Sequence, residues 1–182
     1  MSMTEPKMVG VTPRMELAVQ VSDRVQIQDV RLVRCNCQMQ PAALALPAPM
    51  RFRWSFAHNA STQAKPDGTH IAVLARFRFS ANREGSTGDQ PSIAIEATFL
   101  LTYAASSMNG LGEEHLRSFG TFNGVFNAWP YWRELLQSIT SRMGLPGLVV
   151  PVFRLGSAGP QASAMTAPTS ELESGQGERP AT

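Results

Sequence analysis

Alternating apolar and polar residues dominate the first half of the chain and indicate β-strands. Within residues 21–40 the apolar positions change parity between Ile27 and Val30, which predicts a bulge near Asp29. Three further stretches alternate strictly, and each places its large apolar residues on one face: residues 51–56, 71–79 and 92–106. Proline-rich or turn-forming segments separate the four stretches, with no helical pattern between them. The sequence therefore predicts four antiparallel strands in one sheet.

The second half of the chain changes to a helical period. Apolar residues recur at intervals of three and four from Val125 to Met143, which is the stripe expected along one face of a helix. Pro130 interrupts this stripe, so the helix is either kinked there or restarts with Pro130 in its first turn. Gly144 fits the position just past the helix end, where a left-handed backbone is common.

The residues before this stripe are less favourable for helix formation. Gly120 and Gly124 each cost roughly 1 kcal/mol relative to alanine within a helix. We therefore expect residues 113–127 to form a weaker and more mobile helix than residues 131–143. Residues 145–155 follow as an extended, proline-punctuated apolar strip. Together these elements predict an α+β fold, with a four-stranded antiparallel sheet packed against a long, kinked C-terminal helix.

One folded domain accounts for the length of 182 residues. Residues 156–182 are rich in Gly, Ser, Ala and Pro and cannot bury enough surface to offset the entropy of ordering, so we expect a disordered tail. Residues 1–20 are expected to form a flexible arm, which leaves residues 21–155 as the folded domain. Residues 1–155 carry 15 basic and 11 acidic side chains, so the folded part is more basic than the whole chain, whose net charge is +2.

Charge and hydropathy exclude several classes of protein. The basic residues are spread along the chain without a block of five or more, which argues against a nucleic-acid-binding protein. The longest apolar runs fall far short of the roughly 20 residues that cross a bilayer. Residues 1–20 also lack the continuous apolar core of a signal peptide. The composition therefore favours a reduced, cytoplasmic protein that does not insert into a membrane.

Candidate catalytic residues form no recognisable site. The chain lacks the motifs of serine hydrolases, zinc proteases and P-loop proteins, and its Gly110-x-Gly112 pair is incomplete as a dinucleotide signal. Cys35 and Cys37 are expected to be buried, reduced thiols, because no second pair completes a zinc site. The three histidines are far apart in the sequence and have no metal-ligand spacing. The sequence thus predicts no catalytic, cofactor or metal site and favours a binding protein.

One segment in the second half of the chain has a specific pattern. It reads Ala128-Trp129-Pro130-Tyr131-Trp132-Arg133-Glu134, followed by Ser138, Ser141-Arg142, Pro146, Leu148 and Pro151-Val152. This pattern resembles the C-terminal half of the SecB export chaperones, which have Pro-Tyr-x-Arg-Glu, then Ser-Arg, then Pro-x-Leu and Pro-Val. The segment Val25-Gln26-Ile27-Gln28 also resembles the first strand of that family. The resemblance covers about residues 25–155 and is strongest around the helix.

The resemblance implies a fold, an assembly and a function. It implies a four-stranded antiparallel sheet against a long helix, in a homotetramer built as a dimer of dimers. SecB-type proteins are ATP-independent holdases that bind unfolded preproteins in apolar grooves and pass them to the SecA motor. Some SecB-like proteins instead serve toxin–antitoxin pairs. That alternative stays open, as does a small-ligand-binding pocket protein built from the same sheet and helix.

Two sets of residues carry the expected binding roles. Client contact is assigned to the exposed members of a set on the last strand and the first half of the helix: Phe99, Leu101, Tyr103, Phe119, Phe122, Val125 and Phe126. The resemblance places a SecA-type partner surface at Arg34, Gln38 and Glu96. The family has carboxylates where Arg34 and Gln38 stand here, and only Glu96 keeps its charge. We therefore expect docking to a conventional SecA to be weak.

Overall fold

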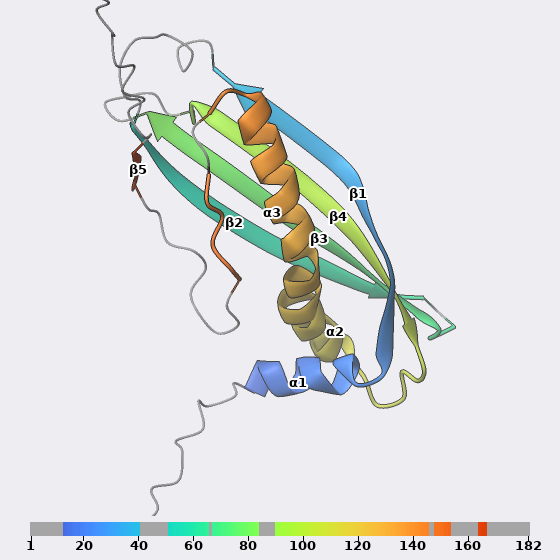
Figure 1. Cartoon of the computed structure of the whole chain (residues 1–182). Coiled ribbons are helices and arrows are strands. Elements are labelled where there is room, and N and C mark those ends of the chain that lie inside the picture. Colours follow the sequence, from blue (N-terminus) through green and yellow to red (C-terminus); the bar gives the residue numbers. More distant parts are fainter. Residues whose placement is uncertain are drawn as a thin grey trace, which may run out of the picture.

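Four long strands form one antiparallel sheet, and a helical rod lies across one of its faces (Figure 1). The computed structural model describes residues 13–40, 51–65, 67–83, 90–145, 148–153 and 164–166. The strands are β1 (Val25–Met39), β2 (Arg51–Ala64), β3 (His70–Arg83), β4 (Ile93–Ala105) and a short β5 (Ala164–Thr166). Their order across the sheet is β1-β4-β3-β2-β5, which leaves β1 as one edge strand. The predicted α+β class and four-stranded antiparallel sheet are confirmed.

The two central strands produce most of the core. Odd-numbered residues 71–81 of β3 and 93–103 of β4 are buried and face the helical rod, whereas the residues between them face the opposite side. The buried set includes Ile71, Val73, Phe77, Ile95, Phe99 and Leu101. Each such side chain contributes about 1.5–3 kcal/mol by leaving water. The strict alternation in the sequence therefore defines an inner face, against the rod, and an outer face.

Edge strand β1 contains two bulges. Its register with β4 skips one residue between Ile27 and Asp29 and another between Leu32 and Arg34. The first is the bulge predicted near Asp29, and the second was not predicted. Because each skip changes which parity faces the rod, Ile27, Val30 and Leu32 all lie opposite inner-face residues of β4. The bulges thus keep the apolar residues of β1 on the inner side.

The rod consists of three consecutive helical segments. They are α2 (Glu113–Phe119), a π-helical turn η2 (Gly120–Gly124) and α3 (Val125–Arg142). The predicted stripe is present, since Val125, Trp129, Trp132 and Leu136 are buried against the sheet. Helix α3 contains Pro130 in its interior and begins five residues earlier, so it does not restart at the proline. Gly144 has a φ of +68° just after the helix, as its predicted place past the helix end requires.

The glycines of the π-helical turn allow the rod to approach the sheet closely. Both Gly120 and Gly124 are buried. A Cβ atom at Gly124 would lie 2.6 Å from Cγ1 of Val73 on β3, and one at Gly120 would collide with the Thr62 hydroxyl on β2. The two glycines therefore lower helix stability, but the close packing of the rod against the sheet requires them. The greater mobility expected for residues 113–127 stays a prediction.

A short helix, α1 (Pro13–Ser22), packs against α2 at one end of the sheet (Figure 1). Ala18 and Val21 are buried, and the Asn123 side-chain amide donates a hydrogen bond to the Ser22 hydroxyl over 3.2 Å. The expected flexible arm thus differs from the structure over residues 13–20, because two small apolar residues three apart give this helix a face to bury. Residues 1–12 lie outside the described part.

The chain after the rod returns along it. Leu148 and Val150 are buried, the Trp129 indole N–H donates to the Pro151 carbonyl over 3.0 Å, and the Gln137 amide donates to the Leu148 carbonyl over 3.4 Å. Farther on, β5 pairs with the first residues of β2. Residues 164–166 therefore form a strand within the tail expected to be disordered, and the remainder of residues 156–182 lies outside the described part.

Candidate functional site

The rod leaves apolar side chains uncovered along both of its sides. On one side lies the β1 flank, which we define as Ile27, Val30 and Leu32 of β1 with Tyr131 and Leu135 of α3. Ile27, Leu32 and Tyr131 are 44%, 46% and 49% exposed. Tyr131 packs toward the edge strand, because its ring lies 6.4 Å from that of Phe99, which is the inner-face partner of Leu32. The β1 flank borders an edge of the sheet that no other strand of the described ranges pairs with.

On the other side lies the β2 flank, which we define as Phe56 of β2, Phe126 and Trp129 of α3, and Val152 and Phe153. The ring of Trp129 lies 6.3 Å from Phe56 and 5.3 Å from Phe153. Phe126 and Gln137 are eleven residues apart, about three helical turns, so they lie on the same side of α3. Because the Gln137 amide donates to the Leu148 carbonyl of the returning segment, Phe126 also lies on the side of that segment. Phe126 is 49% exposed and Val152 is 61% exposed. This flank is therefore an open, aromatic surface on a buried aromatic base.

The seven residues assigned to client contact occupy different environments. Five are buried in the core of the protomer: Phe99, Leu101, Tyr103, Phe119 and Val125. Phe122 is half-buried beside α1, and Phe126 is exposed on the β2 flank. Since the assignment concerned exposed members of the set, the prediction now rests on Phe122 and Phe126.

Several members of the two flanks were not selected from the sequence. The alternation of β2 placed Phe56 on the apolar face, and the Pro-Val pair near the end of the family pattern includes Val152. Neither signal indicates that a residue stays exposed after folding. Ile27 and Leu32 are exposed because the rod does not cover β1, and that follows only from the strand order.

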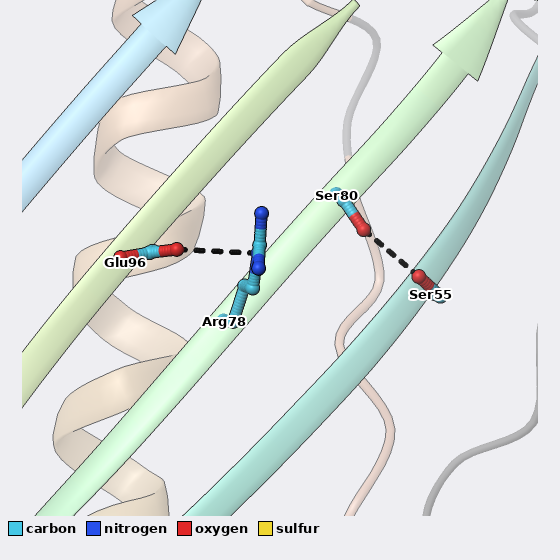
Figure 2. Close-up of polar contacts among 4 residues, drawn as sticks. All are labelled: Ser55, Arg78, Ser80 and Glu96. Carbon is cyan, nitrogen blue, oxygen red and sulfur yellow. Dashed lines mark hydrogen bonds and ion pairs between the residues drawn. The ribbon is translucent and has the colours of Figure 1, made fainter. Parts of the chain in front are cut away.

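The expected partner residues lie together on the outer face of the sheet. Asn36 of β1 pairs with Glu96 of β4, and Arg34 and Gln38 lie two residues to either side of Asn36. All four are exposed. The Glu96 carboxylate forms an ion pair with Arg78 of β3, with 3.2 Å between Oε1 of Glu96 and Nε of Arg78 (Figure 2). The structure therefore brings Arg34, Gln38 and Glu96 into one patch, on the side of the sheet away from the rod.

Burial is the main cause of the displaced pKa values of three titratable groups. Burial lowers the pKa of His58, whose ring lies 5.3 Å from Phe153. Burial raises the pKa of Tyr103, and a hydrogen bond from Asn127 partly opposes this shift. Partial burial, together with a hydrogen bond to Cys35, raises the pKa of Cys37 to about 11. Cys37 is thus a thiol at neutral pH, which makes it a poor nucleophile.

The environment of the two cysteines differs from the sequence expectation. Cys35 and Cys37 are exposed, with their Sγ atoms 3.6 Å apart. The prediction of buried thiols was wrong because β1 is an edge strand and the rod does not cover it. Among the described residues, no group of three or more His, Cys, Asp or Glu side chains could hold a metal ion. No helix in the described ranges is long and apolar enough to span a bilayer.

Comparison with solved structures identifies the fold of the chain. No protein-family model and no curated protein sequence matches the chain. Among solved structures, it is similar to the Mycobacterium tuberculosis SecB-like chaperone Rv1957, in complex with a ChAD peptide from the Rv1956 HigA1 antitoxin. The TM-score is 0.63 at 19% sequence identity, and the match covers 76% of this chain and 97% of that chain. The chain has the SecB-like fold.

The SecB-like fold agrees with the resemblance found at the Pro-Tyr-x-Arg-Glu pattern. In the structure this pattern lies on α3, where Trp129 and Trp132 face the sheet while Tyr131 and Glu134 face outward. The pattern therefore combines core residues of the SecB-like fold with residues that the fold leaves exposed.

Proposed function

We propose that this protein is an ATP-independent holdase chaperone that binds unfolded polypeptides along the β2 flank. The observation that carries the proposal is an open apolar surface, containing Phe126 and Val152, on a SecB-like fold. An extended client would cover these side chains and gain about 25 cal/mol for each Å² of apolar surface removed from water. Such binding is non-directional, which suits a chaperone with many clients.

A small-ligand-binding protein is less well supported. The apolar cavity between the sheet and the end of the rod has a volume of about 20 Å³, enough for about one water molecule. It is lined by Trp54, Phe79, Ile93 and Leu148 among others. Ligand sites of drug-like size measure about 300–1,000 Å³ and are mainly apolar. Two larger hollows, of about 270 and 360 Å³, lie on the polar outer face of the sheet.

A chaperone dedicated to a toxin–antitoxin system is the second candidate. It is favoured by one observation, the structural neighbour's complex with an antitoxin peptide. On this proposal the β2 flank would hold one antitoxin segment instead of many preproteins. The two candidates differ in selectivity, so binding of several unrelated unfolded proteins with similar affinity supports the general holdase.

We further propose that the protein acts in the cytoplasm as a homotetramer, a dimer of dimers, in which the β1 flank contacts a second copy. The support is the unpaired edge of β1 beside exposed Ile27 and Leu32. We expect transfer of clients from this protein to a conventional SecA to be weak. Arg34 and Gln38 replace carboxylates of the family, so a partner surface that pairs with carboxylates would meet the wrong charge here.

Aggregation of a chemically unfolded protein, followed by light scattering, tests the holdase proposal. We expect the wild-type protein to suppress scattering of two unrelated clients without ATP and to form a complex of increased mass. The paired variant Phe126→Ser with Val152→Ser should lose this activity while keeping the wild-type Tm. Thr121→Ala with Ser141→Ala changes exposed rod positions outside the β2 flank without removing apolar surface and serves as the control. Full activity of the paired variant would contradict the assignment of the β2 flank.

A further inference from the structure

The outer face of the sheet contains two adjoining hollows. One has a volume of about 270 Å³ and the other about 360 Å³. Both are lined by Arg78 and Glu96, so the ion pair of Figure 2 lies where the hollows meet. Figure 2 shows the pair on the side of the sheet away from α3. The two hollows therefore form one elongated depression across β1, β4, β3 and part of β2, opposite both flanks.

The first hollow is basic. The strand register aligns Arg34 of β1, Thr98 of β4 and Arg76 of β3 in one row across the sheet. Arg34 and Arg76 are exposed, and neither makes an ion pair within the described residues. Neighbouring strands are about 4.8 Å apart, and the two arginines line the first hollow from the strands on either side of β4. Arg78, one row further along β3, adds a third cation that Glu96 only partly neutralises at the exposed surface.

Beyond the Arg78–Glu96 ion pair, the second hollow is lined mainly by amide side chains. Asn36 and Gln38 of β1, Gln40 just after it and Gln90 all line this hollow. The Gln40 side-chain amide donates a hydrogen bond to Oε1 of the Gln90 side chain over 3.3 Å. An amide side chain both donates and accepts hydrogen bonds, as a peptide group does. This end of the depression therefore matches the backbone of an extended polypeptide.

We propose that the outer face is a docking site for an extended, acidic polypeptide segment. Its carboxylates would pair with Arg34 and Arg76, and its backbone would bind the amides of the second hollow. Arg76 and Arg78 are two residues apart on one strand, and this spacing equals that of alternate side chains in an extended segment. Charge complementarity selects an acidic partner, and the same charges disfavour a basic docking segment.

A nucleic acid fits this surface less well than an acidic polypeptide. The depression contains three arginines and one carboxylate, whereas nucleic-acid interfaces neutralise many phosphates with lysine and arginine. Glu96 lies at the centre, where a phosphate backbone would bring a negative charge with every nucleotide, whereas a polypeptide can place an uncharged residue there. The amide end offers no further positive charge.

Fluorescence anisotropy with a labelled twelve-residue peptide of alternating Glu and Ser tests the proposal. The full-length protein should bind this peptide and should bind the matching Gln-Ser and Lys-Ser peptides at least tenfold more weakly. The double variant Arg34→Glu with Arg76→Glu should weaken binding of the Glu-Ser peptide roughly 10- to 100-fold, because two charge-assisted hydrogen-bonding groups are reversed. The double variant Arg117→Glu with Arg142→Glu makes the same change of charge on the rod and should bind as the wild type does.

Three results would overturn the proposal. The first is equal binding of the Glu-Ser and Gln-Ser peptides, and the second is an equal loss in both double variants, which would indicate a general charge effect. The third is displacement of the peptide by a single-stranded oligonucleotide of the same charge at a lower concentration than unlabelled peptide. The variant with Phe126→Ser and Val152→Ser should still bind the acidic peptide, so failure of the holdase proposal and failure of this one are distinguishable.

Discussion

The close approach of the rod to the sheet depends on single hydrogen atoms at two positions. Gly124 lies directly above Val73, a β-branched residue whose side chain is buried and stiff about χ1. Gly→Ala substitution usually favours a helix by about 1 kcal/mol. Here the new methyl group would collide with Cγ1 of Val73, so overpacking at a cost of about 1–3 kcal/mol opposes that gain.

We therefore predict that Gly124→Ala lowers the free energy of unfolding by up to about 2 kcal/mol, as the net of these two effects. Denaturant unfolding measures the change. Adding Val73→Ala should recover part of the loss caused by Gly124→Ala, because it removes the colliding atom, and a double-mutant cycle isolates this coupling. A higher stability for Gly124→Ala alone would contradict the close approach.

Phe126 and Phe119 make a matched pair of phenylalanines on the rod. Phe119 is 1% exposed and lies 5.0 Å from the Tyr103 ring, whereas Phe126 is largely open to solvent. Phe119→Ala should cost about 3–5 kcal/mol of stability. Phe126→Ala should change stability by less than about 1 kcal/mol and should weaken binding of an unfolded client several-fold. Thermal unfolding and client titration of both variants check the prediction; a large drop in Tm for Phe126→Ala would assign it to the core.

The sequence predicted which residues lie on the apolar face better than which of them stay exposed. Strict alternation identified Phe99, Leu101 and Tyr103 as one face, and all three are buried. Whether such a face meets the rod, a second copy or a client depends on where the rod crosses the sheet. That position is determined by long-range packing, including the approach at Gly124, which periodicity does not encode.

The returning segment after the rod is held against β2 partly through a neutral histidine. His58 packs edge-to-face with Phe153 and stacks near Phe77. Burial lowers the pKa of His58 in the folded protein below its ordinary value of 6.5. The folded state therefore binds fewer protons than the unfolded state as the pH falls through and below 6.5, and stability is lost over that range.

We predict that the Tm falls between pH 7.5 and pH 5 and that His58→Phe reduces this fall. Phenylalanine keeps a ring against Phe153 and Phe77 but does not titrate. Thermal unfolding of both proteins across this pH range is the measurement. Identical pH profiles for wild type and variant would show that His58 does not couple protonation to the packing of this segment.

Element boundaries were predictable where one local pattern dominates. The four strands and the stripe of α3 follow directly from periods of two and about 3.6. Helix α1 was missed because its buried residues are only Ala18 and Val21, a weak signal in a window with charged neighbours. Strand β5 was missed because it forms only by pairing with β2, far away in the sequence.

At the scale of the whole molecule, the outer and inner sides of the sheet carry different chemistry. The inner side has the apolar flanks on either side of the rod, and the outer side has arginines, amides and one central carboxylate. One thin sheet thus separates a surface suited to unfolded chains from one suited to an acidic segment. The two proposed partners would not compete for the same residues.

The remaining surface to be covered is the edge strand itself. Strand β1 is 15 residues long, and within the described ranges only β4 pairs with it. Long apolar edges tend to pair with another chain. Leu32 and Val33 are exposed beside the second bulge, at 46% and 52%. We therefore predict self-association through β1, with a mass in solution near four times the 19.8 kDa of the chain.

Light scattering of wild type and of the double variant Leu32→Asp with Val33→Lys tests this assembly. The variant places charges on the edge, and opposite signs keep the net charge of the chain unchanged. Its mass should fall to that of a smaller species, since burying an unpaired charge in an interface costs several kcal/mol. Val149→Asp with Val152→Lys makes the same exchange on the returning segment and should keep the wild-type mass. A wild-type monomer at micromolar concentration would contradict the prediction, and an equal loss of mass in both variants would place the interface elsewhere.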